Sequence, residues 1–242
     1  MAHNLISPYM HTLHGGHRRI LGFYETFENE PRFGYIDETF SAPTKDLNGY
    51  GIHQGHYAMA MTIIENQDVR SLRDSLTDIS GNYYHANESA QQRNIDMLNI
   101  TGRYTNMDTN IIAVHTSIPY GASEEETQHI MRSARNESLT ALLKLATDRE
   151  DPVKAFVIER TMRETENQKD RQTIQRLTRN NIIPPINYVQ VSSTAERNLW
   201  AADAVAYSMA QALLRSDLTL QEKSGIQLSI YDTQTLGLID LK

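Results

Sequence analysis

Apolar positions along the chain gather in five short blocks that favour β-strands. The blocks cover residues 33–38, 56–64, 111–116, 154–159 and 186–191, and they are rich in aromatic and β-branched side chains. The block at 56–64 is almost continuously apolar, which is typical of a central strand covered on both faces. A weaker alternating block at 226–230 is compatible with either an edge strand or a tail.

Between these blocks, apolar residues recur at helical spacing. The helices expected on this basis span residues 67–80, part of 83–99, 123–147, 168–180 and 193–215. Ser123 with Glu126, and Ser193 with Glu196, have the spacing of a capping box, in which the serine and the acid satisfy the first free N–H groups of a helix. These two pairs predict helix starts.

The order of the elements predicts an α/β fold. Two strands without a long crossover favour an antiparallel pair, and the later alternation of strand and helix favours parallel pairing with helices packed on the sheet. We therefore expect a mixed five-stranded sheet flanked by helices, with a helical insertion after the second strand. This order matches the ribonuclease H-like arrangement, an analogy that by itself fixes no chemistry.

The chain divides into three expected parts. Residues 1–31 are polar and predict an N-terminal arm outside the core, residues 32–216 the ribonuclease H-like domain, and residues 217–242 a C-terminal extension packed on that domain. In the arm, His14 and His17 flank two glycines, a spacing that suits either a metal ligand pair or a solvated tail. The tail is the favoured interpretation, because no third ligand is fixed beside them.

Composition excludes several classes of protein. The 242 residues include 39% hydrophobic ones, enough for a core, and the net charge is −7. No apolar run approaches 18 residues, so no membrane span is expected. Cysteine is absent, which excludes disulfides and cysteine-rich zinc sites and fits a reducing compartment. The N-terminus lacks the pattern of a signal peptide, so we expect a cytoplasmic protein.

Four acids occupy positions where apolar residues are expected. Glu137 and Asp203 lie on the apolar stripes of two predicted helices, and Asp37 and Glu159 each close an apolar strand. A carboxylate on a core face is unfavourable unless it meets a cation or hydrogen-bond donors. If the four converge at one edge of the sheet, Mg²⁺ or Mn²⁺ would relieve their repulsion, because these ions prefer several oxygen ligands.

Each of these acids also has a structural interpretation. Glu137 and Asp203 suit the margin of a helix stripe, paired with a nearby Arg or Lys, and the two strand-end acids suit turns. Small residues around Asp203 make the functional interpretation stronger there, because they allow close backbone approach.

Histidines and basic residues add further candidates. His85 and Glu88 share a polar stretch and suit a metal ligand, a proton relay or a surface role. His53 and His56 suit either the lining of a site above the sheet or a plain loop, and the loop is the favoured interpretation. Residues 160–180 carry a net charge of +3 in an acidic protein, which suits a polyanionic substrate or a solvated helix of mixed charge. The candidate nucleic-acid-binding residues there are Arg160, Arg163 and Arg171.

Three segments resemble the DUF3800 family. Tyr35–Thr39 resembles its opening strand motif, Tyr84–Ala86 its short His-Ala motif, and Trp200–Ala206 its closing helix motif, with the match spanning residues 33–215. The resemblance implies a ribonuclease H-like fold and a metal-dependent nuclease of the kind found in bacteria, phages and mobile elements. It implies that Asp37, Glu38 and Asp203 are metal ligands with His85 nearby. Glu159 takes the place where such folds often hold an acid on the fourth strand.

The leading hypothesis is therefore a metal-dependent nuclease that hydrolyses phosphodiester bonds in DNA or RNA. Asp37 would bridge two metal ions, and Glu159 and Asp203 would each hold one of them. Glu38 or Glu137 would complete the ligand set. His85 would relay a proton. The alternative is a non-catalytic module that keeps the fold and binds nucleic acid or a partner protein. The Ala-rich last helix suits either a homodimer contact or burial. A sugar hydrolase using paired carboxylates ranks last, because the chain has one Trp.

Overall fold

The computed structural model describes residues 15–41, 44–45, 52–53, 55–215, 217–233 and 235–239. Its centre is a six-stranded mixed sheet in the order β7-β6-β1-β4-β5-β8, and a separate two-stranded ribbon pairs β2 with β3. The strands are β1 (Arg32–Ser41), β2 (Thr44–Lys45), β3 (Ile52–His53), β4 (Gly55–Glu65), β5 (Asn110–Ile118), β6 (Ala155–Glu159), β7 (Asn187–Val191) and β8 (Ser229–Asp232).

The strand directions agree with the pattern expected from the sequence. β1 pairs antiparallel with β4, and β4 antiparallel with β5, whereas β6 is parallel to both β1 and β7. The five predicted strand blocks are all strands. The weak block at 226–230 contributes to β8, a sixth strand that lies parallel to β5. The mixed sheet flanked by helices is thus confirmed, with one strand more than expected.

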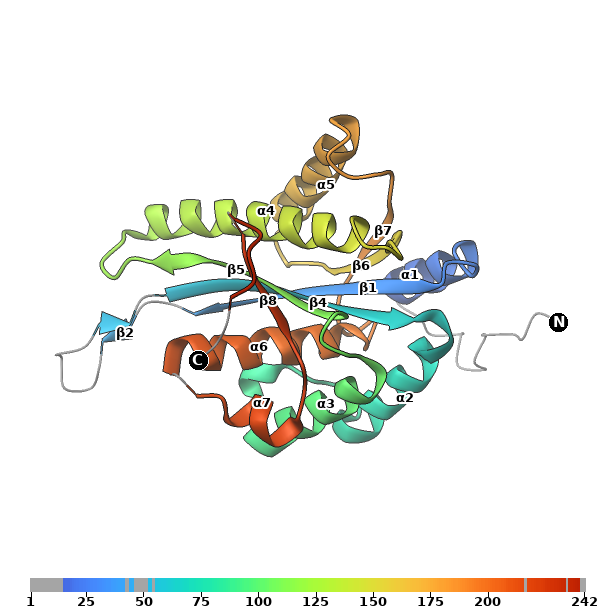
Figure 1. Ribbon diagram of the computed structural model, residues 1–242, viewed down its shortest axis with the longest axis horizontal. Coiled ribbons are helices and arrows are strands. Elements are labelled where there is room, and N and C mark those ends of the chain that lie inside the picture. Colours follow the sequence, from blue (N-terminus) through green and yellow to red (C-terminus); the bar gives the residue numbers. More distant parts are fainter. Residues whose placement is uncertain are drawn as a thin grey trace.

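Helices cover both faces of this sheet (Figure 1). They are α1 (Gly15–Thr26), α2 (Val69–Ser80), α3 (Gln91–Tyr104), α4 (Glu124–Thr147), α5 (Glu164–Arg179), α6 (Leu199–Arg215) and α7 (Thr219–Ser224), with single 3₁₀ turns at Asn66–Asp68 and Ala86–Glu88. The expected insertion after the second predicted strand is therefore present as α2 and α3. The capping box of Ser123 and Glu126 starts α4 as predicted.

Two apolar clusters form the core, one on each face of the sheet. The first includes Tyr35 of β1 and Trp200 of α6, and α1, α2 and α3 also contribute to it. The second includes Ile36 of β1 and Leu142 of α4, together with residues of α5. Because neighbouring residues of a strand point to opposite faces, Asp37 belongs to the first face and Glu38 to the second. We call these the Asp37 face and the Glu38 face.

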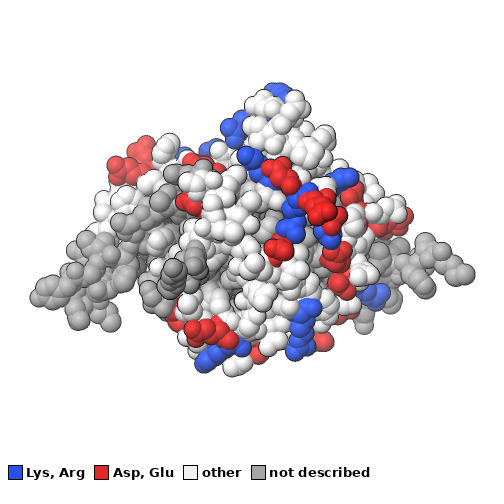
Figure 2. Space-filling view, viewed as in Figure 1, with Lys and Arg blue, Asp and Glu red and all other residues white. Residues whose placement is uncertain are grey.

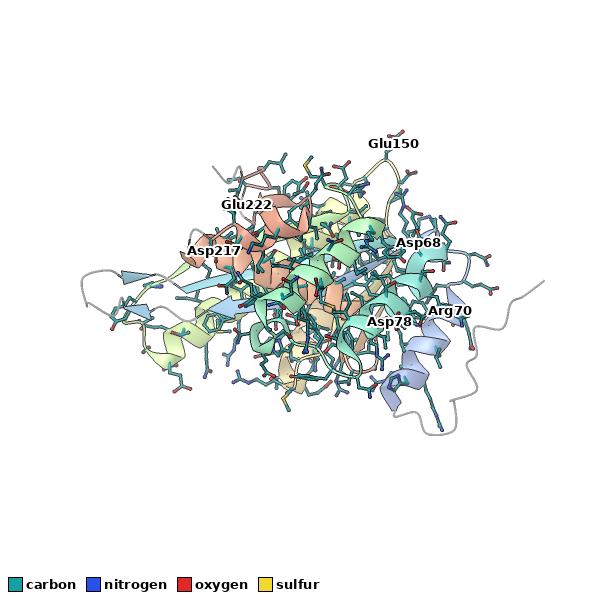
Figure 3. All side chains as sticks on the ribbon, turned by 90° about the horizontal axis from the view of Figure 1, so that it is seen from below. Asp68, Arg70, Asp78, Glu150, Asp217 and Glu222 are labelled. Carbon is teal, nitrogen blue, oxygen red and sulfur yellow. The ribbon has the colours of Figure 1, made fainter. Side chains whose placement is uncertain are left out.

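The outer sides of the helices carry charge. In the view of Figure 2, Lys and Arg lie intermixed with Asp and Glu over the region of α5 rather than forming one basic band. On the other layer, Asp68, Arg70 and Asp78 lie along the outside of α2 and the turn before it (Figure 3), while Val69 and Leu72 are buried. This amphipathic pattern matches the helical spacing from which α2 was predicted.

The N-terminal arm differs from expectation. Residues 15–26 form α1, and its Ile20, Phe23 and Tyr24 are buried in the core of the Asp37 face. These positions are three residues and one residue apart and therefore lie on one side of a helix. The Tyr24 hydroxyl also hydrogen-bonds the hydroxyl of Tyr35 at 2.8 Å. The polar composition of residues 1–31 hid this short stripe. Residues 1–14, including His14, lie outside the described part of the chain.

The last large helix also begins later than predicted. It starts at Leu199, not at Ser193, because Glu196 is fully buried and forms a two-pronged ion pair with Arg73 of α2, at 3.2 and 2.6 Å. The acid therefore joins two distant segments, and its Oε1 also accepts from the Asn198 backbone N–H at 2.9 Å, directly before the helix. In the described part of the chain, every helix is too short or too polar to span a bilayer.

Candidate functional site

Three of the predicted carboxylates lie on the Asp37 face, each from a different element. Asp37 is in β1, Glu159 ends β6, and Asp203 is in α6, which packs on β1. β1 and β6 are parallel, and their register pairs Ile36 with Ile158, so Asp37 and Glu159 follow as the next neighbours. Strand alternation then turns both acids toward α6.

Burial and mutual repulsion both raise the pKa values of Asp37 and Glu159. Burial raises the pKa of Asp37 well above its usual range, and the negative charges of Asp203 and Glu159 raise it further. Burial also raises the pKa of Glu159 to about 7, opposed by hydrogen bonds from Ser193 and reinforced by the charge of Asp203. The three carboxyl groups are therefore close enough to resist full ionisation together.

Hydrogen bonds orient these carboxyl groups. The Glu38 backbone N–H donates to Asp37 Oδ1 at 2.7 Å, and the Ala86 backbone N–H donates to Asp203 Oδ2 at 2.9 Å. Ser193 Oγ donates to Glu159 Oε1 at 3.3 Å. The second oxygen of Glu159, Oε2, is buried and has no hydrogen-bond partner. A buried carboxylate oxygen without a donor is an unsatisfied acceptor, which suits a cation.

His85 stands at the edge of the same group. Its Nδ1 lies 3.4 Å from Asp203 Oδ2, and its side chain is 51% exposed. Its hydrogen bond to Asp203 raises the pKa of the imidazole, against the opposing effect of burial. The loop is fixed by Asn94, which accepts from the Tyr84 hydroxyl at 2.8 Å and donates to the Ala86 carbonyl at 3.0 Å. The Tyr84–Ala86 segment thus brings a histidine and a backbone donor to Asp203.

Glu38 is not part of this group, which corrects the expectation that it binds metal beside Asp37. It points to the Glu38 face, where its carboxylate accepts hydrogen bonds from Tyr57 and from the guanidinium of Arg135. The physical reason is the two-residue period of a strand, which sends adjacent side chains to opposite faces. Arg135 lies on the buried side of α4 and also binds Asp170.

Of two further candidates, Glu137 lies apart from the three carboxylates and Glu88 lies close to His85. Glu137 is on α4, which covers the Glu38 face, and its Oε1 accepts a hydrogen bond from Ser133 at 2.9 Å. It is therefore not a member of the group. Glu88 follows His85 by three residues and accepts a hydrogen bond from the Tyr83 hydroxyl at 2.9 Å.

The predicted nucleic-acid-binding arginines are engaged by neighbouring acids. Arg160 and Arg171 both pair with Glu164, at 2.9 and 2.6 Å, and Arg163 pairs with Glu166 at 3.4 Å. The stretch therefore presents less free positive charge than its sequence count of +3 indicated.

Sequence reasoning missed two contributors to the site. Ser193 was assigned to a helix cap, yet its side chain binds Glu159; its position just beyond a strand was the available signal. The Ala86 backbone N–H could not be identified from residue type at all.

His56, for which a plain loop was the favoured interpretation, lies at the beginning of β4, and burial lowers the pKa of its imidazole. For His53 the structure describes the strand position alone.

The carboxylates do not form a closed metal cage. Among the residues that the structure describes, no three His, Asp or Glu side chains are gathered at a spacing ready to hold a metal ion. No family model matches the chain, and no curated protein matches it, so its function has to be inferred from the site itself.

Proposed function

We propose that the protein is a metal-dependent nuclease that hydrolyses phosphodiester bonds in DNA or RNA at the Asp37, Glu159 and Asp203 group. One observation carries the proposal. Three carboxylates from separate elements meet on one face, where burial and, to a smaller extent, their mutual repulsion raise the pKa values of Asp37 and Glu159, and Glu159 Oε2 is buried without a donor. Such a group is unfavourable for folding by itself and favourable for binding divalent cations.

The finer fold assignment belongs to the same proposal. The order β5-β4-β1-β6-β7, with β1, β4 and β5 antiparallel and β6 and β7 parallel, supports a ribonuclease H-like arrangement to which β8 is added. The Tyr35–Thr39 and Trp200–Ala206 segments, which suggested the DUF3800 family, contribute Asp37 and Asp203 to the site. Membership in that family is proposed on this basis.

The type of donor suits Mg²⁺ or Mn²⁺, although the three side chains would have to move closer together to hold an ion. Asp37, Glu159 and Asp203 would hold the ion or ions through carboxylate oxygens, the ligand type these ions prefer. When bound, the metal would activate water for attack and stabilise the charge that develops on the phosphate.

The chain's own groups prepare the site for this chemistry. The N–H groups of Glu38 and Ala86 each hold one oxygen of Asp37 or Asp203, which leaves the other oxygen of each carboxylate available. His85, half exposed beside Asp203, is placed to hold a proton at Nε2 while Nδ1 faces the carboxylate. This proton can be given to the leaving oxygen of the substrate.

Cleavage of end-labelled DNA and RNA oligonucleotides with Mg²⁺ or Mn²⁺ tests the proposal. Asp37→Asn and Asp203→Asn are expected to reduce cleavage at least about a hundredfold, because loss of even an outer-shell partner of a metal site typically costs 10–100-fold. Asp78→Asn, which alters an exposed acid on α2, is the control and should keep full activity. Equal cleavage by wild type and both site variants would refute the assignment.

A non-catalytic module is the second candidate, favoured by the pairing of Arg160, Arg163 and Arg171 with acids. Thermal unfolding separates the two. At a concentration 100 times its Kd, a bound cation stabilises the folded state by about 2.7 kcal/mol, which raises the melting temperature by roughly 5–10 °C. A melting temperature unchanged by millimolar Mg²⁺ and Mn²⁺ would favour the module. Binding of nucleic acid, formation of a homodimer and binding of a partner protein all stay predictions.

A further inference from the structure

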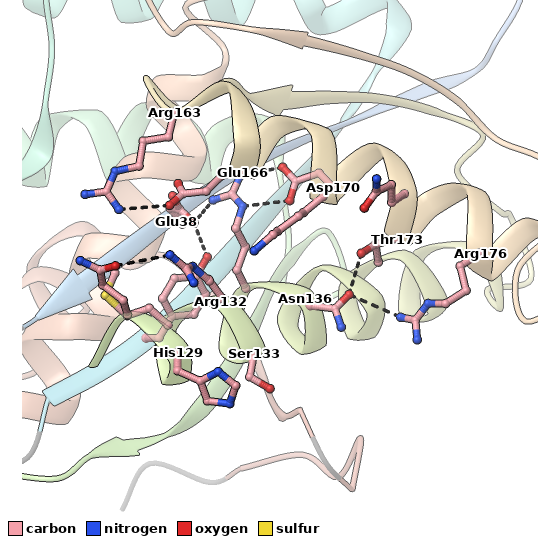
Figure 4. Close-up of a pocket in the computed structure, with 16 residues that line it drawn as sticks. Glu38, His129, Arg132, Ser133, Asn136, Arg163, Glu166, Asp170, Thr173 and Arg176 are labelled. Atoms are coloured by element: carbon pink, nitrogen blue, oxygen red, sulfur yellow. Dashed lines mark hydrogen bonds and ion pairs between the residues drawn. The ribbon is translucent and has the colours of Figure 1, made fainter. Parts of the chain in front are cut away.

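A cavity lies on the Glu38 face, between α4 and α5, with a volume of about 520 Å³. Its walls come from the two helices, and Glu38 and Tyr57 reach it from the sheet (Figure 4). Because Asp37 and Glu38 point to opposite faces of β1, this cavity and the carboxylate group are on opposite sides of the sheet. The nuclease proposal makes no use of it.

The inner part of the cavity is a fixed polar network. Arg135 donates through Nε and one terminal nitrogen to both oxygens of Asp170, at 2.9 and 2.8 Å, and its other terminal nitrogen donates to Glu38. Gln190 adds a hydrogen bond to Asp170 at 3.2 Å. The Arg135 side chain is 9% exposed and that of Asp170 3%, so these groups satisfy one another and form a rigid surface.

The outer walls carry positive charge that no acid neutralises. Within the part of the chain that the structure describes, Arg132 of α4 and Lys169 and Arg176 of α5 form no ion pair with a carboxylate. Arg132 reaches Gln128, and Arg176 reaches Asn136, each at 3.4 Å, and both acceptors are neutral.

The balance of charge around the cavity is therefore positive. The lining holds five Arg and Lys residues, namely Arg132, Arg135, Arg163, Lys169 and Arg176, against the three acids Glu38, Glu166 and Asp170. This net charge of +2 stands out in a protein whose total is −7. The free cations face a hollow rather than a flat surface, so a ligand could be contacted from both helices.

We propose that this cavity binds a small phosphorylated ligand of nucleotide size. Planar guanidinium groups match phosphate oxygens, and two arginines on facing helices can contact one phosphate chain from two sides. The volume lies within the roughly 300–1,000 Å³ typical of small-molecule sites and exceeds what inorganic phosphate needs. Met131 and the aliphatic parts of the arginines supply apolar surface for a base.

Isothermal titration with ADP, in EDTA to keep the carboxylate site out of the measurement, tests the proposal. Arg132→Gln and Arg176→Gln change exposed side chains and are expected to weaken ADP binding about tenfold or more each, as expected for loss of a charge-assisted contact. Arg179→Gln, on the same helix but outside the lining, is the matched control and should bind normally. Asp37→Asn should also bind normally, which separates this site from the proposed nuclease site.

Two further probes decide the ligand class. Inorganic phosphate is expected to bind more weakly than ADP, and a single-stranded oligonucleotide is expected not to compete with ADP. Three results would overturn the proposal: no binding of ADP, AMP or pyrophosphate; equal loss of binding in Arg179→Gln; or binding of the oligonucleotide alone, which would make the cavity part of a polynucleotide path.

Discussion

Replacing Glu159 with Gln should raise the stability of the metal-free protein relative to wild type as the pH increases from 5 to 8. Glu159 ends β6, and its Oε2 is buried without a donor while the charge of Asp203 opposes its ionisation. Glutamine has nearly the same shape and no charge. The substitution therefore removes electrostatic repulsion but leaves the packing of the strand end unchanged.

The magnitude follows from the pKa of Glu159, which is raised to about 7 in the folded protein from its ordinary value of 4.5. Because the raised pKa belongs to the folded state, that state binds more protons between pH 4.5 and 7, and stability falls as pH rises through this window. At about 1.4 kcal/mol per pKa unit, ionised Glu159 lowers the free energy of unfolding by about 3 kcal/mol at pH 8 and by under about 1 kcal/mol at pH 5.

The assay is thermal unfolding of wild type and Glu159→Gln in EDTA at both pH values. The amide NH₂ that replaces Oε2 also lacks a partner, which costs about 1–3 kcal/mol at either pH. The readout is therefore the difference between the two pH values. The variant should gain about 2–3 kcal/mol relative to wild type on going from pH 5 to pH 8, or roughly 5–10 °C in melting temperature.

Glu164→Gln is the control, because its exposed carboxylate pairs with Arg171 and Arg160, which lower its pKa to about 2. A carboxylate whose pKa is lowered by folding stabilises the folded state at pH values above its unfolded pKa. Its removal in Glu164→Gln should therefore give no gain in stability relative to wild type on going from pH 5 to pH 8. The reasoning about Glu159 is refuted if Glu159→Gln changes stability equally at pH 5 and pH 8, or if its relative gain appears at pH 5.

Three further outcomes are expected. Asp37→Asn should raise the metal-free melting temperature at pH 8, where the charged form is disfavoured, and should abolish the increase caused by Mn²⁺; a retained increase would place the cation elsewhere. Arg135→Met leaves two carboxylates without their buried cation and should lower the free energy of unfolding in urea by about 3–5 kcal/mol, whereas no loss would mean that the network is dispensable. Gly34→Ala places a Cβ 2.9 Å from the Phe156 ring and should cost about 1–3 kcal/mol by overpacking, so a neutral result would show that the ring can move.

Local periodicity was sufficient to predict five strands of the sheet and most of the helices, but not α1 or the start of α6. The apolar blocks at 56–64 and 154–159 are strands because β-branched and aromatic residues pack well on a pleated sheet, and the stripe on α2 matches its buried side. The same alternation places Asp37 and Glu38 on opposite faces. The resemblance to a family motif, which treats the two acids as one unit, concealed this consequence of the sequence.

Long-range pairing was decided by the tertiary structure. Glu196 has the spacing of a helix cap, yet Arg73, 123 residues away, draws it into a buried ion pair. Arg135 likewise has no sequence signal that links it to Glu38 and Asp170. Spacing along the chain indicates which nearby residues share one face of a helix or strand. It carries no information about which charged residue from a distant segment will pair with them.

The same distinction applies to the site. The sequence by itself determined that Asp37, Glu159 and Asp203 are acids in apolar surroundings, because each interrupts a local pattern. Their approach to one another depended on strand order and on the packing of α6 across β1. The physical reason is that the position of an acid on an apolar stripe follows from local periodicity, whereas its burial and its repulsion by other carboxylates depend on distances that only the folded protein sets.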